Sequence, residues 1–130
     1  FPLTPVSASR SDPAQTVPLL GLHARGEAAR LCSVREEDAR AMKGYAGSIA
    51  IDSAGERIAL TSSHGGVVML FGIDGTPLTL IRRQDAAGVA AGPEGFIVTD
   101  GMGVVSRYDG QGLTVLGRMN EAWDNHLVAI

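Results

Sequence analysis

The chain has 130 residues, of which 45% are hydrophobic and 19% are charged, and its formal net charge is −3. This length suits one domain, and no apolar run approaches the roughly 18 residues that a membrane-spanning helix needs. The basic residues form no cluster larger than the pair Arg82 and Arg83, and a mildly acidic chain without a basic face is a poor partner for nucleic acid.

The N-terminal part carries two predicted segments. Residues 1–18 lack periodicity and hold four of the six prolines, which favours an irregular Pro-rich arm. Residues 19–45 follow, and we expect a hairpin and a short helix that lead into the remainder of the chain. The hairpin would turn at 24–26, between two short apolar runs. Cys32, the single cysteine, is interpreted as a buried small residue rather than a reactive thiol.

The sequence predicts a helix over 34–43. Ser33 and Glu36 have the spacing of a capping box, in which two side chains satisfy backbone N–H groups at the start of a helix. Lys43 suits the C-terminal end of the helix dipole. Gly44 can adopt the left-handed conformation that commonly ends a helix.

Residues 46–83 change to the pattern of strands. Four β-rich runs, GSIAID, ERIALTS, GVVMLFG and LTLIRR, are separated by short segments rich in Gly, Ser and Asp. These separators have turn chemistry, because Gly accepts a positive φ and Asp or Ser forms local hydrogen bonds. Strands at spacings of about ten residues indicate an antiparallel meander.

The strand pattern then repeats over 86–118, in the order GVAA, GFIVTD, GVVSRYD and LTVLGR. The number of residues between matching positions of the two repeats is in the range of a four-stranded propeller blade. We therefore predict an all-β chain of two propeller-type antiparallel blades (46–83 and 86–118) and a final strand (125–130) that begins a third unit. In this alignment of the repeats, His126 takes the position that Ser48 has in the first unit and Gly88 in the second. A small β-sandwich would fit the strand count but not the repeat. Two blades and a strand cannot close a propeller, so further blades would come from a longer chain or from homo-oligomerisation.

Blade geometry predicts one face that is richer in chemistry than the others. In a four-stranded meander, the turn before the first strand and the turn between strands two and three lie at the same edge. Seven candidate binding residues would share that face: His64, Asp85, Asp100, Trp123, Asp124, Asn125 and His126. The alternative is structural, because an Asp-Asn-His run can cap backbone groups at a strand start and a Trp can pack between blades.

No reaction can be read from the motifs. The sequence lacks an H-x-x-x-H pair, a carboxylate-rich loop and a G-x-S-x-G nucleophile motif. The GMG run at 101–103 suits a hairpin turn rather than a dinucleotide fingerprint, which needs a following helix. We name no catalytic residue, and cofactor and metal stay unknown.

Three stretches carry a family resemblance. GYAGSIAIDSAGERIALTSSHGGVVMLF, AAGVAAGPEGFIVTDGMGVV and WDNHLVAI resemble the C-terminal part of bacterial proteins with the DUF1513 domain, over about residues 17 to 130. The family typically has a Cys where this chain has Ala87, so any role of that thiol is absent here. The resemblance implies a longer propeller, export from the cytoplasm, and genes that lie beside those for imelysin-like and di-haem peroxidase-like proteins connected with iron acquisition.

Two functional hypotheses follow. The first is a non-enzymatic binding or scaffold propeller of the bacterial periplasm, or a fragment of one, that serves an iron-uptake system through a periplasmic protein partner or a small ligand. The second is a propeller metal-binding protein or enzyme that uses the His and Asp groups of the same face. The fold cannot decide between them, because propellers support both.

Overall fold

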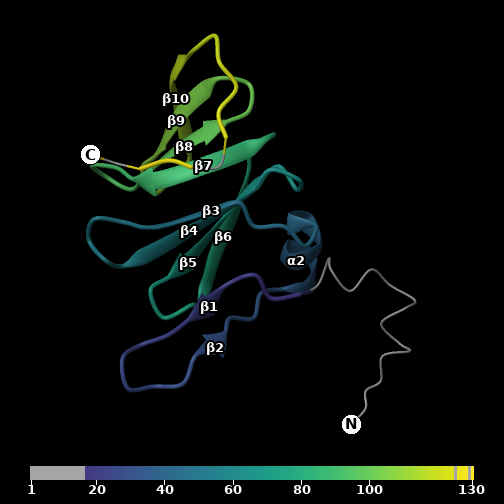
Figure 1. The fold of residues 1–130 in the computed structure, drawn as a ribbon, viewed down its shortest axis with the longest axis vertical. Helices are drawn as coiled ribbons and strands as arrows, with labels where there is room; N and C mark the ends of the chain where they lie inside the picture. The colour runs from purple at the N-terminus through teal and green to yellow at the C-terminus, as the bar shows by residue number, and fades with distance from the viewer. Residues whose placement is uncertain (1–16, 125, 129) are drawn as a thin grey trace.

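A computed structural model describes residues 17–124, 126–128 and 130 of the chain. The described part contains two four-stranded antiparallel sheets, one two-stranded sheet and one helix, arranged as stacked layers (Figure 1). The predicted all-β fold of blade-like sheets is confirmed. Most of the predicted arm over 1–18 lies outside the described residues. None of the described helices is both long and apolar enough to span a bilayer.

The first blade is a meander in which each strand pairs with the next one along the chain. Its strands are β3 (Ser48–Ile51), β4 (Arg57–Ser62), β5 (Val67–Gly72) and β6 (Pro77–Arg82). β4 and β5 are almost wholly buried, whereas β6 is largely exposed. An apolar strand that is covered on both faces explains the continuous hydrophobic run of β5.

The second blade repeats this order with β7 (Ala86–Ala91), β8 (Phe96–Asp100), β9 (Val104–Tyr108) and β10 (Leu113–Arg118). The register repeats as well as the topology. Ile49 pairs with Leu60 in the first blade, and Val89 pairs with Val98 at the equivalent place in the second. The sequence repeat is therefore a repeat of whole blades.

The two blades pack face to face through a shared core, with β7 lying across β3 and β4 (Figure 1). Buried apolar side chains of both sheets fill this core: Ala59, Val68, Leu70, Ala86, Val89, Phe96, Val98 and Tyr108. Two hydroxyl groups of the first blade also bind the backbone of β7. The hydroxyl of Thr61 donates to the carbonyl of Ala87 at 2.6 Å, and the N–H of Val89 donates to Oγ of Ser48 at 3.1 Å.

The N-terminal hairpin covers the other face of the first blade. β1 (Gly21–Leu22) pairs with β2 (Arg30–Leu31), and the turn between them closes with Gly26 at a φ of +82°. Leu20 and Cys32 beside this hairpin pack into a second core with Ile58, Leu60, Val67, Met69 and Phe71 of the blade. Cys32 is buried there, as predicted.

Helix α2 (Glu36–Met42) is shorter than the predicted 34–43 and begins without the predicted capping box. Arg35, in an extended conformation, takes the N-cap position and makes no side-chain cap. Its Nε instead donates to Oδ2 of Asp38 at 3.1 Å, one turn along the helix. An ion pair at the spacing i, i+3 therefore lies at the first turn of the helix, where the predicted capping box is absent. Both Lys43 and Gly44 have a positive φ at the C-terminal end.

The predicted strand over 125–130 is described only in part, because residues 125 and 129 lie outside the described residues. The structure assigns no strand to 126–128 or 130. The segment nevertheless runs beside β7 (Figure 1). A side chain added at Gly88 would meet Cβ of Leu127 at 2.9 Å and the carbonyl oxygen of Asp124 at 3.4 Å.

Candidate functional site

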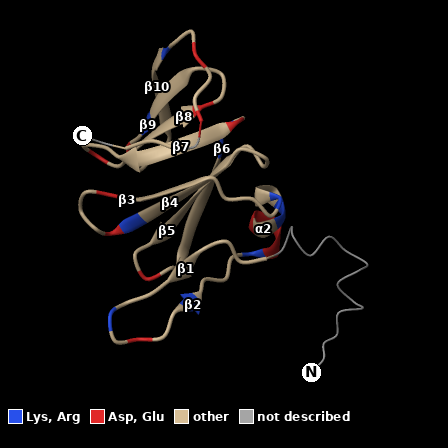
Figure 2. Ribbon diagram, in the orientation of Figure 1, with Lys and Arg blue, Asp and Glu red and all other residues tan. Residues whose placement is uncertain are grey.

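One end of the blades carries turns that backbone contacts tie together in pairs. We call it the turn face and define it as residues 62–66, 83–86, 100–103 and 119–124. The N–H of Arg83 donates to the carbonyl of Gly66 at 2.9 Å, and the N–H of Gly101 donates to that of Asp85 at 3.1 Å. The N–H of Met119 donates to the carbonyl of Gly103 at 2.7 Å. Each of these bonds joins segments that lie 16 or 17 residues apart in sequence, at one end of the blades. Charged residues lie on α2, on the N-terminal hairpin and around the turns at both ends of the blades (Figure 2).

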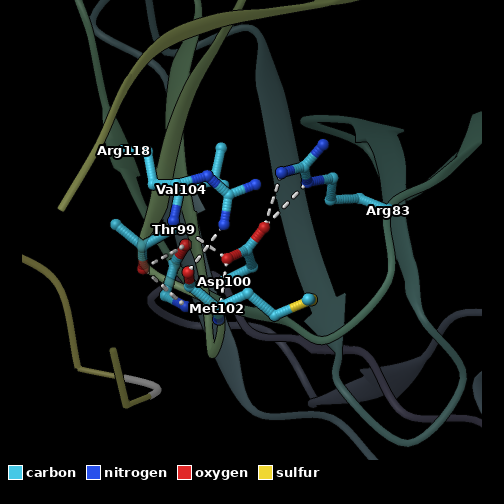
Figure 3. A network of polar contacts seen from close by, with 7 residues as sticks. Arg83, Thr99, Asp100, Met102, Val104 and Arg118 are labelled. Carbon is cyan, nitrogen blue, oxygen red and sulfur yellow. Dashed lines mark hydrogen bonds and ion pairs between the residues drawn. The ribbon is translucent and has the colours of Figure 1, made fainter. Parts of the chain in front are cut away.

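Asp100 is an acidic residue of the turn face whose carboxylate accepts four hydrogen bonds (Figure 3). Its side chain is 2% exposed. Oδ2 accepts from Nε and Nη2 of Arg83 at 3.0 and 2.6 Å, and Oδ1 accepts from the N–H groups of Met102 and Val104 at 2.9 and 3.0 Å. Arg83 follows the last strand of the first blade, so this carboxylate joins the two blades and shapes the β8–β9 turn at once.

The environment of Asp100 favours its charged form. Burial alone would raise the pKa of this carboxyl group. The N–H of Val104, the guanidinium of Arg83 and the N–H of Met102 outweigh that effect and lower the pKa below its ordinary value of 3.8. A carboxylate that is ionised, buried and fully engaged holds structure together rather than facing a ligand.

His64 and Asp85 line one cleft of about 350 Å³ on the turn face, together with Arg82, Gln84 and the backbone of 63–66. The ring of His64 stacks on that of Tyr45, with centroids 4.0 Å apart and an angle of 20° between the planes. Asp85 has a φ of +59°, a left-handed conformation that Asp tolerates better than most residues. The residues that line the cleft thus include a histidine, an aspartate and an arginine.

The C-terminal quartet lies apart from this cleft. Trp123 is half-buried, and its Nε1 has no hydrogen-bond partner within the part of the chain that the structure describes. Asp124 is exposed, and its backbone lies beside Gly88. Asn125 lies outside the described residues. His126 lines a second cleft, of about 460 Å³, between the start of β3 and residues 126–128.

The structure therefore places four of the seven candidates in three different surroundings. His64 and Asp85 share the smaller cleft, His126 lines the larger one, and Asp100 is enclosed between the blades. Sequence reasoning missed Arg82, Arg83 and Tyr45. The sequence showed the pair Arg82-Arg83 as the largest basic cluster. The signal that could have placed the pair on the turn face is its position at the end of β6, the outer strand of the first blade.

A metal site has no support among the residues that the structure describes, since no three His, Cys, Asp or Glu side chains gather there in a way that could hold an ion. The hypothesis of metal binding or catalysis stays an untested prediction.

Comparisons with known proteins identify the family of this chain. A search of curated proteins finds no match. The model of one family, described as a protein of unknown function (DUF1513), matches residues 6–130, which is essentially the whole chain. The resemblance expected from WDNHLVAI and the blade repeat is therefore confirmed, and the chain belongs to the DUF1513 family.

Proposed function

We propose that this chain is a non-enzymatic binding or scaffold propeller of the bacterial periplasm, which serves an iron-uptake system and recognises its partner at the turn face. The observation that supports binding is the cleft that His64, Arg82 and Asp85 line. This cleft has an acidic and a basic residue beside the stack of His64 on Tyr45. It therefore suits a partner surface that presents a basic and an acidic group in return.

The state of Asp85 strengthens this proposal. Within the described residues its carboxylate has no hydrogen bond or ion pair with another side chain, yet its backbone occupies the sparsely populated left-handed region. Residues held in such conformations cluster at ligand-binding sites. The backbone bond from Gly101 to Asp85 keeps the residue in place without engaging the carboxylate.

The periplasmic location and the link to iron uptake rest on the family resemblance alone. If the proposal is right, the chain separates with the periplasmic fraction of its host. Its amount should rise when the host is starved of iron, and quantitative proteomics of fractionated cells measures both. A cytoplasmic chain whose amount ignores iron would contradict this part.

The binding proposal is tested by placing a photo-crosslinking amino acid at position 64 in the native host. Illumination should give one defined adduct that is absent from a control with the same group at position 112, in the turn at the opposite end of the second blade. Equal adducts from both positions, or none from position 64, would contradict a specific turn-face partner.

Affinity for the crosslinked partner, once purified, is the second readout. His64→Ala and Asp85→Asn should each weaken binding by about tenfold, the loss expected for one charge-assisted hydrogen bond. Asn also tolerates the left-handed conformation, so the melting temperature should stay unchanged. Glu94→Gln removes a similar exposed charge in the β7–β8 turn and serves as the control. His126→Ala reports whether the larger cleft contributes.

A further inference from the structure

Arg57 begins β4 at the end of the blades opposite the turn face, and its side chain reaches the second blade. Its Nε donates to Oδ2 of Asp52 at 3.0 Å. Oδ1 of Asp52 accepts from the backbone N–H groups of Glu56 and Arg57 at 2.8 and 3.1 Å, so the carboxylate is fixed in its orientation. The guanidinium carbon lies 5.8 Å from the centre of the Tyr108 ring of β9. The guanidinium is therefore held on two sides, yet the side chain is 29% exposed.

The outer edge of this guanidinium has no partner. Within the residues that the structure describes, neither Nη1 nor Nη2 of Arg57 makes a hydrogen bond. A Cβ atom added at Gly110 would lie 3.5 Å from Nη1, and one added at Gly95 would lie 3.6 Å from Nη2. Because both neighbours are glycines, no side chain from these positions covers the two nitrogens. The pair of N–H groups matches the two oxygens of one carboxylate.

Arg57 also lines a cleft of about 150 Å³ between the β3–β4 turn and the β7–β8 turn. A cavity of about 150 Å³ can hold a molecule as large as benzene, so an acid with a few carbon atoms has room here. Glu56 and Glu94 line the same cleft and are exposed. Their charges repel a dianion more strongly than a monoanion, which favours a single carboxylate over phosphate.

The fold does not need the Asp52–Arg57 pair in order to close this turn. By strand pairing, Gly92 and Gly95 take the equivalent places in the second blade. The N–H of Gly92 donates to the carbonyl of Gly95 at 2.9 Å, and the N–H of Asp52 donates to that of Arg57 at 3.0 Å. Backbone bonds close both turns, so the buried carboxylate and the guanidinium are an addition found in the first blade alone of the two.

We propose that Nη1 and Nη2 of Arg57 bind the carboxylate of a small monocarboxylic acid in this cleft. Asp52 uses only Nε, so the opposite edge of the guanidinium is already oriented for the ligand. Such preorganisation lowers the entropy that binding costs. This site lies apart from the turn face and does not depend on the partner proposed there.

The test is a titration of the isotope-labelled full chain in which sodium chloride is replaced step by step with sodium acetate at constant ionic strength. Proton–nitrogen correlation spectra follow the Nε–H signal of Arg57 and the backbone N–H signal of Gly95. Both should shift and saturate with the same affinity. The N–H signal of Gly101, on the turn face, should stay in place.

Variants assign the binding to the guanidinium edge. Arg57→Lys keeps a positive charge beside Asp52 but lacks the paired N–H groups, so it should weaken acetate binding by at least about tenfold. Arg25→Lys, the same exchange in the exposed hairpin turn, is the matched control and should keep the wild-type affinity. Glu94→Gln removes a like charge from the cleft and should strengthen binding by about twofold. Melting curves confirm that each variant is folded.

A capped Gly-Glu-Gly peptide separates a free acid from the side chain of a partner protein. It presents the same carboxylate on a chain, and it should bind at least about tenfold more weakly than acetate because the cleft is small. Equal or tighter binding of the peptide would overturn the assignment to a small acid. Shifts that never saturate, or an acetate affinity that Arg57→Lys leaves unchanged, would overturn the site itself.

Discussion

Asp100 is a buried charge whose four hydrogen bonds serve two purposes. Oδ1 binds the N–H groups of the β8–β9 turn, and Oδ2 binds the guanidinium of Arg83 beyond the first blade. In the repeat, Ser62 takes the same place in the first blade, and its hydroxyl binds the N–H of Gly65 and the carbonyl of Met42. Both residues close the same turn, but only the carboxylate also reaches another blade by an ion pair.

Two substitutions of Asp100 separate these purposes. Asp100→Asn keeps an acceptor for the turn but loses the charge that pairs with Arg83, so we expect a loss of about 1–3 kcal/mol in the free energy of unfolding. Asp100→Ala also removes the turn bonds and should cost about 3–5 kcal/mol. Urea unfolding measures both, and equal losses would mean that only one of the two purposes matters.

The lowered pKa of Asp100 also predicts a dependence on pH. Because the folded state holds this carboxyl group more strongly ionised than the unfolded state does, its stabilising effect is complete above the ordinary pKa of 3.8. The effect disappears as the pH falls below that value toward the lowered pKa of the folded state. Below pH 3.8 the wild type should lose up to about 1.4 kcal/mol per pH unit more than Asp100→Asn. Parallel acid unfolding curves for the two proteins would contradict this.

The sequence placed Asp100 at the right end of the blade but could not reveal its partner. Arg83 lies 17 residues earlier, beyond a strand and a link between blades. Which side chains meet across such a link depends on strand register and blade stacking, and no local motif encodes either. The same reason explains why the stack of Tyr45 on His64 was not foreseen.

At the scale of elements, α2 shows that a local motif can yield to tertiary contacts. The S-x-x-E spacing predicted a cap at Ser33, but the helix begins after Arg35. Its position is set by docking on the first blade, where Met42 is buried and its carbonyl accepts from the hydroxyl of Ser62 at 2.7 Å. Strand positions were predicted better, because alternating apolar runs bounded by Gly, Asp and Ser specify strands and turns locally.

Gly65 permits the close approach of α2 to the β4–β5 turn. A Cβ atom at this position would lie 1.9 Å from the carbonyl oxygen of Ala41, which belongs to the backbone and cannot turn aside. Gly65→Ala should therefore lower the free energy of unfolding by about 1–3 kcal/mol and the melting temperature with it. Gly112→Ala is the control, because nothing lies within 4 Å of its added Cβ. A Gly65→Ala protein as stable as that control would show that α2 does not dock this closely.

At the scale of the whole molecule, hydroxyl groups of one blade bind the innermost strand of the next. Thr61 is fully buried and donates to the carbonyl of Ala87. Thr61→Val keeps the shape but leaves that carbonyl without its partner, so we expect a loss of about 1–3 kcal/mol. Thr114→Val, on the exposed strand β10, should change stability by less than about 0.5 kcal/mol. Chemical unfolding measures both losses in free energy, provided that the dependence on denaturant concentration is the same for all the proteins. Equal losses for Thr61→Val and Thr114→Val would argue against the contact between blades.

The central claim is that the blades and the C-terminal segment are successive units of one propeller-type array. The most direct test is an isotope-edited nuclear Overhauser spectrum of the full chain. Our account predicts contacts from Ser48 to Val89 and from Thr61 to Ala87, and equivalent contacts from Leu127 to Gly88. Contacts between the blades without any from Leu127 to Gly88 would contradict the third unit, and the absence of all three would contradict the array itself.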